Sequence, residues 1–143
     1  MVEVAARPAK AVMIYDGDCS FCSRWIHRWQ QTIGSRLDYL PFQDLGVAAR
    51  FPEVPRGQFE TAVQLVETDG RVYGGAEAVF RALAHTPRRG RLLDWYERSP
   101  VFARASEWAY RLVARHRGFF SALTRRTVRP CRPFDKTGCW GNG

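Results

Sequence analysis

Apolar and polar positions alternate along the chain in short blocks that predict alternating strands and helices. A strand is expected at about 11–15, because Val12 to Tyr15 form the continuous apolar run typical of a strand covered on both faces. Apolar residues then recur at helical spacing over about 20–33, and Gly34 is expected just past the end of that helix. The pattern therefore begins with a buried strand, a tight turn and an amphipathic helix.

The next blocks continue this alternation. Residues 37–42 predict a second strand, and Pro41 favours a position at the edge of the sheet. Asp44 is expected to cap a short helix, and residues 52–58, with two prolines and a glycine, are expected to form a loop. Because a helix separates the first two strands, the pair is expected to run parallel.

A hairpin is predicted in the middle of the chain. Residues 61–66 form a β-rich run, Asp69-Gly70 supplies the turn, and residues 71–73 form the returning strand. An apolar helix face is expected over residues 76–85. The resulting order, β-α-β-α-β-β-α, predicts an α/β fold with a mixed four-stranded sheet.

The last third of the chain is expected to be a helical extension. A short helix should stop before Pro100, and an amphipathic helix should follow it, with an irregular tail after both. We expect a single domain over residues 1–143. It has a loose start over 1–9, a core at about 10–86, the extension at about 88–125 and the tail at about 128–143.

Charge divides the chain unevenly. Residues 1–85 carry 9 basic and 10 acidic side chains, whereas residues 86–143 carry 13 and 4, so the net charge of +8 comes from the second part. Such a basic region could meet nucleic acid or an anionic membrane surface, although we favour a solvated, arginine-rich helix face. No apolar run approaches the ~18 residues of a membrane span, and the N-terminus lacks the features of a signal peptide. A cytoplasmic location is the default expectation.

The candidate chemistry lies at Cys19 and Cys22, which open the first predicted helix after the turn 16–18. Unpaired N–H groups and the helix dipole favour a thiolate there. We expect Cys19 to be the more exposed sulfur and to attack a disulfide, and Cys22, one turn along, to resolve the mixed disulfide. The third candidate is Asp16, which could exchange a proton with Cys22 or could simply hold the turn closed.

Three stretches carry a resemblance to a known family: Tyr15-Asp16-Gly17-x-Cys19-x-x-Cys22, Asp69-Gly70-Arg71-Val72-Tyr73-Gly74-Gly75-Ala76-Glu77-Ala78, and Tyr110-Arg111-x-Val113-Ala114-Arg115-x-Arg117. The first resembles the motif of the DCC family of thiol-disulfide oxidoreductases, named for that Asp and those two Cys. The three stretches together extend over roughly residues 10–120.

The resemblance implies a thioredoxin-like fold, with which the predicted order of elements agrees, and dithiol oxidoreductase activity. The substrates would be thiols or disulfides, in proteins or in small molecules, and the protein would need no organic cofactor. One departure concerns residues 57–62, which contain no proline. Thioredoxin-like proteins usually place a cis-proline before the third strand of their core, so recognition of a peptide backbone at that point is in doubt.

A different class of function remains open. Cys19, Cys22, Cys131 and Cys139 could hold zinc in a small module whose basic C-terminal part binds nucleic acid. The seven-residue gap between the last two cysteines is unusual for such a site, so the redox pair is favoured and no metal is expected. We favour an incidental role for Cys131 and Cys139 over a disulfide or an electron relay.

Other side chains carry two interpretations each. Trp25 and Trp29 could form a hydrophobic surface for substrates, but their helical spacing favours core packing. The residues of the third family-like stretch, Tyr110, Arg111, Arg115 and Arg117, could bind an anion or could pack a helix and form a buried ion pair, and neither interpretation is favoured.

Overall fold

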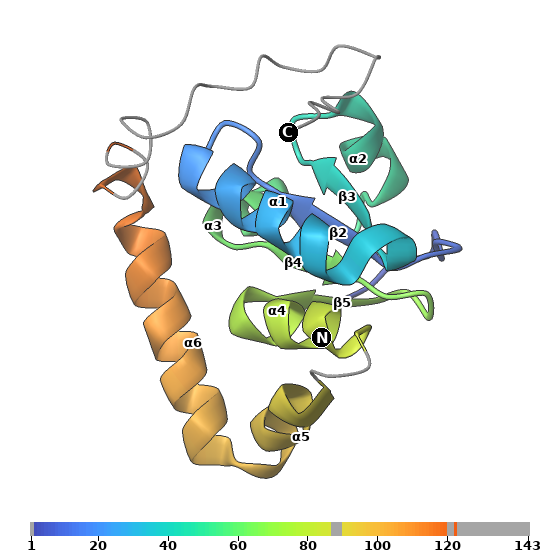
Figure 1. Cartoon of the computed structure of the whole chain (residues 1–143). Coiled ribbons are helices and arrows are strands. Elements are labelled where there is room, and N and C mark those ends of the chain that lie inside the picture. The colour runs from blue at the N-terminus through green and yellow to red at the C-terminus, as the bar shows by residue number, and fades with distance from the viewer. Residues whose placement is uncertain (1, 87–89, 120–121, 123–143) are drawn as a thin grey trace.

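The computed structural model describes residues 2–86, 90–119 and 122. A mixed five-stranded sheet lies at its centre, with helices on both faces (Figure 1). The strand order across the sheet is β1 (Val2–Glu3), β5 (Arg71–Gly74), β4 (Gln64–Val66), β2 (Val12–Tyr15) and β3 (Asp38–Pro41).

The helical segments are α1 (Ser20–Ile33), the short 3-10 helix η1 (Gly34–Arg36), α2 (Leu45–Arg50), α3 (Arg56–Thr61), α4 (Gly75–Ala84), α5 (Gly90–Arg98) and α6 (Pro100–Arg115). In Figure 1, α6 runs along one side of the molecule, from α5 toward the end of α1 at which that helix begins. The predicted first helix, the two helices around Pro100 and the Asp44 cap, which accepts the N–H of Gly46, are confirmed.

The pairing of the strands confirms three predictions. β2 runs parallel to β3, which is an edge strand, and β4 and β5 form the antiparallel hairpin. Each face of the sheet has its own apolar cluster. Met13, Leu65 and Tyr73 pack with α1 and α4, whereas the alternate strand residues Val12 and Val66 pack with α2 and α3.

Three predictions about the chain's elements are wrong. The sheet has five strands rather than four, because Val2–Glu3, expected to be loose, pairs with β5. Two paired residues are too few to show a period of two in the sequence. The predicted loop over 52–58 is irregular only over 52–55, because α3 begins at Arg56. This helix also takes the first residue of the predicted strand 61–66, and β4 begins only at Gln64. The structure is α/β and is consistent with the thioredoxin-like class.

Two side chains fasten α6 to the rest of the molecule. The Glu107 carboxylate accepts the backbone N–H of Glu77, in the first turn of α4, and the hydroxyl of Tyr96, each at 3.1 Å. It thereby caps a helix to which it does not belong. The Tyr110 hydroxyl accepts the backbone N–H of Val63, just before β4, at 3.0 Å.

Nowhere in the ranges given above is a helix both long and apolar enough to cross a membrane. The cytoplasmic location stays a prediction. The predicted irregular tail over 128–143 lies outside the described residues, as does part of the predicted extension over 88–125.

Candidate functional site

Cys19 is the N-cap residue of α1. Its Sγ accepts the backbone N–H of Cys22 at 3.2 Å, so a sulfur takes the place usually filled by the oxygen of a serine or an aspartate. Helix N-termini favour negative charge because their N–H groups have no partners within the helix. This position therefore stabilises a thiolate at Cys19.

The surroundings of Cys22 favour the protonated thiol over the thiolate. A hydrogen bond to the Cys19 sulfur, burial, and the negative charges of Cys19 and Asp16 all raise the pKa of the Cys22 thiol, and only the Arg117 guanidinium lowers it. Cys22 therefore keeps its proton and donates it toward Cys19. The contacts of Cys22 thus favour its protonated form, whereas the capping position of Cys19 favours a negative charge.

The exposure of the two sulfurs differs from the prediction. Cys19 is buried, with 8% of its surface exposed, and Cys22 is the more exposed of the two. The capping geometry explains this, because the Cys19 side chain turns back over the first turn of α1 to reach the Cys22 N–H. The structure holds both residues as thiols.

The turn before the cysteines is closed by side chains. Asp16 Oδ1 accepts the N–H of Asp18 at 3.1 Å and the Gln43 side-chain amide at 2.8 Å, and Gln43 Oε1 accepts the N–H of Gly17 at 3.0 Å. Gly17 does not have a positive φ, and its role in the turn is steric. A Cβ there would come within 2.9 Å of Pro41 Cβ.

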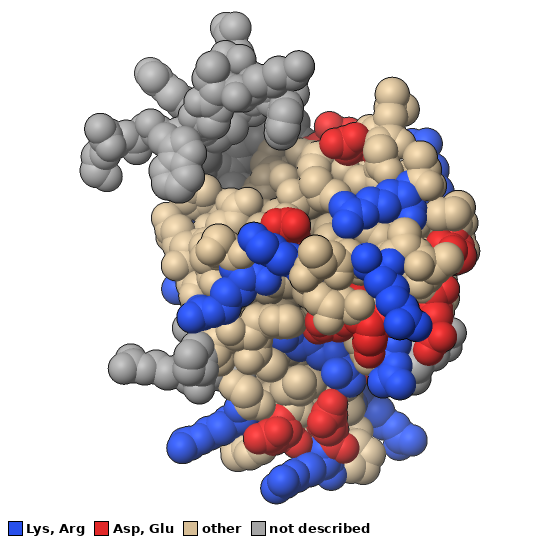
Figure 2. Space-filling model, turned by 90° about the vertical axis from the view of Figure 1, so that its right-hand side faces the viewer, with Lys and Arg blue, Asp and Glu red and all other residues tan. Residues whose placement is uncertain are grey.

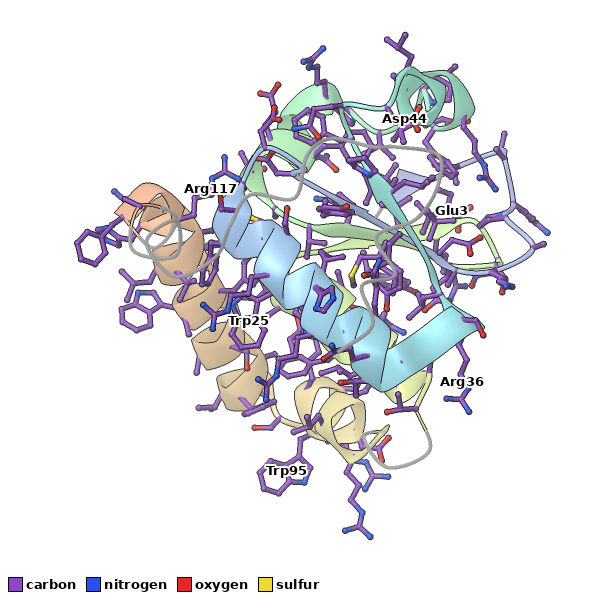
Figure 3. All side chains as sticks on the ribbon, turned by 45° about the horizontal axis from the view of Figure 1, so that its top comes forward. Glu3, Trp25, Arg36, Asp44, Trp95 and Arg117 are labelled. Atoms are coloured by element: carbon purple, nitrogen blue, oxygen red, sulfur yellow. The ribbon has the colours of Figure 1, made fainter. Side chains whose placement is uncertain are left out.

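The chain beyond α6 returns to this turn. Arg117 Nη1 lies 3.6 Å from Asp16 Oδ2, and both side chains are partly buried. Figure 3 shows Arg117 beside the start of α1, at the end of α6 farthest from Trp95. The third family-like stretch has two interpretations, anion binding or helix packing with a buried ion pair. The described contacts of Arg117 include an ion pair, whereas Arg111 and Arg115 are solvent-exposed.

A large apolar groove adjoins the cysteines. Its volume is about 790 Å³, and α1, α4 and α6 supply most of its walls. Cys22 lines one end of it together with Asp16 and Arg117, and no other charged residue lines the groove in the part of the chain that the structure describes. The aromatic wall residues are Tyr15, Phe21, Trp25, Trp29, Phe59, Phe80, Phe102 and Tyr110.

The two tryptophans of α1 have different environments. Trp29 is half-buried and packs against the core cluster, as predicted, but the prediction is wrong for Trp25, which is 43% exposed. The Trp25 ring contacts Phe21 edge-on and Trp29 at a tilt, and it lines the groove. Figure 3 shows Trp25 beside α1. Burial also raises the pKa of Tyr110 to about 12, so its hydroxyl stays neutral.

The metal interpretation gains no support from the described residues, among which no group of three His, Cys, Asp or Glu side chains could hold an ion. His27, next to Ile26 on α1, is exposed. Cys131 and Cys139 lie outside the described residues, so the four-cysteine zinc site and the incidental role both stay predictions.

The basic residues of α6 face solvent. Arg104, Arg111 and Arg115 are all exposed, as expected for a solvated helix face. On the side of the molecule away from α6, basic and acidic side chains are interspersed (Figure 2). Binding of nucleic acid by the C-terminal part stays a prediction.

Sequence reasoning about the site missed some of its contacts. Tyr110 and Arg117 were singled out only through the family-like stretch, and nothing indicated which partners they would have. Gln43 carried no signal at all, since a glutamine after an edge strand is an ordinary surface residue. The cavity itself depends on three helices packing together, which no local pattern encodes.

Comparison with known proteins adds one positive finding. The family described as DCC1-like thiol-disulfide oxidoreductase matches residues 13–122, which include the cysteine turn, the hairpin and α6. No curated protein and no solved structure matches the chain.

Proposed function

The chain belongs to the DCC1-like thiol-disulfide oxidoreductase family, and we propose that it exchanges dithiol and disulfide through Cys19 and Cys22, with Cys19 attacking and Cys22 resolving. The observation that carries this assignment is the asymmetry of the two sulfurs. Cys19 receives a backbone N–H at a helix N-terminus, whereas the contacts of Cys22 favour its protonated form.

The reaction follows from this asymmetry. The Cys19 thiolate attacks one sulfur of a disulfide, forms a mixed disulfide and releases the first thiolate, which takes up a proton. Cys22 then loses its proton and attacks the Cys19 sulfur. The products are a Cys19–Cys22 disulfide and two substrate thiols, so two electrons and the Cys22 proton leave the protein, and water supplies the second proton. The reverse sequence would oxidise a dithiol.

Asp16 is the proposed acceptor of the Cys22 proton. Its negative charge contributes to the raised pKa of Cys22, and both residues line the same end of the groove. Arg117, 3.6 Å from the carboxylate, would hold Asp16 in place and offset the second negative charge when Cys22 ionises. Asp16 also closes the turn through Gln43, so a structural role accompanies the proposed catalytic one.

The same proposal extends to the fold. The strand order β5-β4-β2-β3, with only β2 and β3 parallel, supports a thioredoxin-like core to which β1, α5 and α6 are added. We treat that core and its additions as one domain, because Glu107 and Tyr110 join α6 to α4 and to the residue before β4.

Trapping tests the roles of the two sulfurs. All variants carry Cys131→Ser and Cys139→Ser, so that no thiol outside the cysteine turn remains, and dithiodipyridine serves as the disulfide. The Cys22→Ser variant should accumulate a mixed disulfide at Cys19, because nothing resolves it. If instead Cys19→Ser accumulates one at Cys22 and Cys22→Ser does not react, the roles are reversed. Failure of the dithiol form to react faster than a simple free thiol would overturn the proposed function.

A further inference from the structure

We propose that the groove beside Cys22 binds the substrate itself and selects a small, uncharged, apolar disulfide. This inference rests on the proposed function and adds the substrate class. It concerns the space between α1, α4 and α6 rather than the cysteine turn. Three observations support the proposal: the size and lining of the groove, the charges of its lining residues, and the hydrogen bonds that the backbone beside it already makes.

The size and lining suit a small molecule. Its volume of about 790 Å³ falls within the range of about 300–1,000 Å³ typical of sites for small molecules. Side chains from three helices form the walls, with Trp25 on α1, Phe80 on α4 and Phe102 on α6. Burial of a flat apolar molecule against such walls is favourable by roughly 25 cal/mol for each Å² removed from water.

The charges of the groove disfavour an ionic substrate. Asp16 and Arg117 are the charged residues that line it among those described, and they lie 3.6 Å apart and pair with each other. A carboxylate or an ammonium that enters the groove would lose its hydration, and neither charged lining residue would be free to pair with it. Oxidised glutathione, which carries several carboxylates, therefore fits poorly, whereas an uncharged disulfide loses little on entry.

The backbone beside the groove is already used within the chain. Val63, which lines the groove just before β4, donates its N–H to the Tyr110 hydroxyl at 3.0 Å, and its carbonyl oxygen accepts the N–H of Gly75 at 3.0 Å. An extended peptide binds a strand edge through such backbone groups. At Val63 both groups are occupied, so recognition falls to the apolar walls.

Cys19 does not itself line the groove, but its sulfur lies 3.2 Å from the backbone nitrogen of Cys22, which does, so the exchange already described takes place at that end of the groove. The Cys19 thiolate attacks the apolar disulfide R–S–S–R, the bond between its sulfurs breaks, and one R–S⁻ leaves and is protonated. Cys22 displaces the second R–S⁻ as the Cys19–Cys22 bond forms. The dithiol is the reductant and R–S–S–R the oxidant, so a single turnover of reduced protein balances.

A matched pair of variants on α6 tests the groove. Ala109 and Ala105 are both exposed alanines of this helix, but only Ala109 is among the lining residues. In the background that keeps only the two thiols of the cysteine turn, Ala109→Phe should slow oxidation by dithiodipyridine at least about tenfold. It should leave oxidation by glutathione disulfide unchanged, and Ala105→Phe should change neither rate. Equal slowing of both disulfides, or of neither, would overturn the proposal.

A binding experiment separates this proposal from the proposed function. The probe is dipyridylethane, in which two methylene groups replace the two sulfurs of dithiodipyridine, titrated into the full chain with both cysteines of the turn changed to serine. It should quench tryptophan fluorescence, since Trp25 and Trp29 line the groove, and Ala109→Phe should weaken binding about tenfold or more. Binding of the probe without thiol exchange would contradict the proposed oxidoreductase function alone. Thiol exchange without binding of the probe would contradict the groove proposal alone.

Discussion

The cysteine turn, residues 16–22, and the helix α6 reach the same groove by different means. The turn is closed mainly by contacts within itself, such as the Cys22 N–H on the Cys19 sulfur, with Gln43 and Arg117 as its distant partners. The contacts of α6 join residues far apart in the chain, 30 positions for Glu107 with Glu77 and 47 for Tyr110 with Val63. The reactive cysteines are therefore held mainly by local contacts, whereas the groove beside them depends on contacts between distant parts of the chain.

The largest expected effect separates chemistry from folding within the turn. Cys19→Ser should lower thiol–disulfide exchange to the background rate, because the attacking sulfur is gone. Its stability should be unchanged or slightly higher, because a serine oxygen is a good N-cap acceptor. Cys19→Ala should be equally inactive but about 1 kcal/mol less stable in urea unfolding. Equal stability of the serine and alanine variants would show that the cap contributes nothing.

The next largest expected effect concerns the ion pair between Asp16 of the cysteine turn and Arg117, which follows α6. Asp16→Asn keeps an oxygen for the Asp18 N–H but loses the charge that pairs with Arg117. Resolution of the mixed disulfide should slow by roughly 10²-fold, the lower range for a lost general base, and its pH dependence should change. Asp18→Asn is the control, since Asp18 is exposed and also bonds Gln43. Similar rates for both variants, or unfolding of Asp16→Asn, would make Asp16 structural.

A third variant tests how α6 is held. Glu107→Ala removes a charged acceptor from the Glu77 N–H and the Tyr96 hydroxyl, so unfolding free energy should fall by about 2–3 kcal/mol. Glu97→Ala removes a half-exposed carboxylate that pairs with Arg81, and its effect should stay within about 0.5 kcal/mol. Urea unfolding measures both, and equal losses would mean that Glu107 does not fasten the helix.

The smallest effect is the pH dependence of stability. The pKa of Cys22 is raised in the folded protein above the ordinary value of 9.0, so the folded state holds this proton more tightly than the unfolded chain. The contribution is fully present below that value and is lost as the pH rises above it. Cys22→Ala should flatten the decline in stability on the alkaline side. The same slope in both proteins would contradict the assignment.

The sequence predicted the local features of the molecule better than its long-range ones. The helix Ser20–Ile33 and the hairpin of β4 and β5 follow from periodicity and an Asp-Gly turn. β1 could not be found, because a two-residue strand exists only through its pairing with β5. The helix α3 was hidden by Pro55 and Gly57, which read as a loop although Pro55 serves as the N-cap.

The candidate site shows the same division. Two cysteines three residues apart at a helix start were visible, and so was the nearby Asp16. The burial of Cys19 was not, because it depends on the direction in which a capping side chain turns. The third family-like stretch marked Tyr110 and Arg117 as notable, but only the packing of α6 gives them Val63 and Asp16 as partners.

The most direct test of the account is a peptide map of the protein after oxidation by dithiodipyridine, in the background with Cys131→Ser and Cys139→Ser. The account predicts that one equivalent of disulfide removes both remaining thiols, releases two equivalents of the pyridine thiol and leaves a peptide in which Cys19 is linked to Cys22. A product with the pyridine thiol still attached to one cysteine, only one equivalent of the pyridine thiol released, and no link between Cys19 and Cys22 would contradict it.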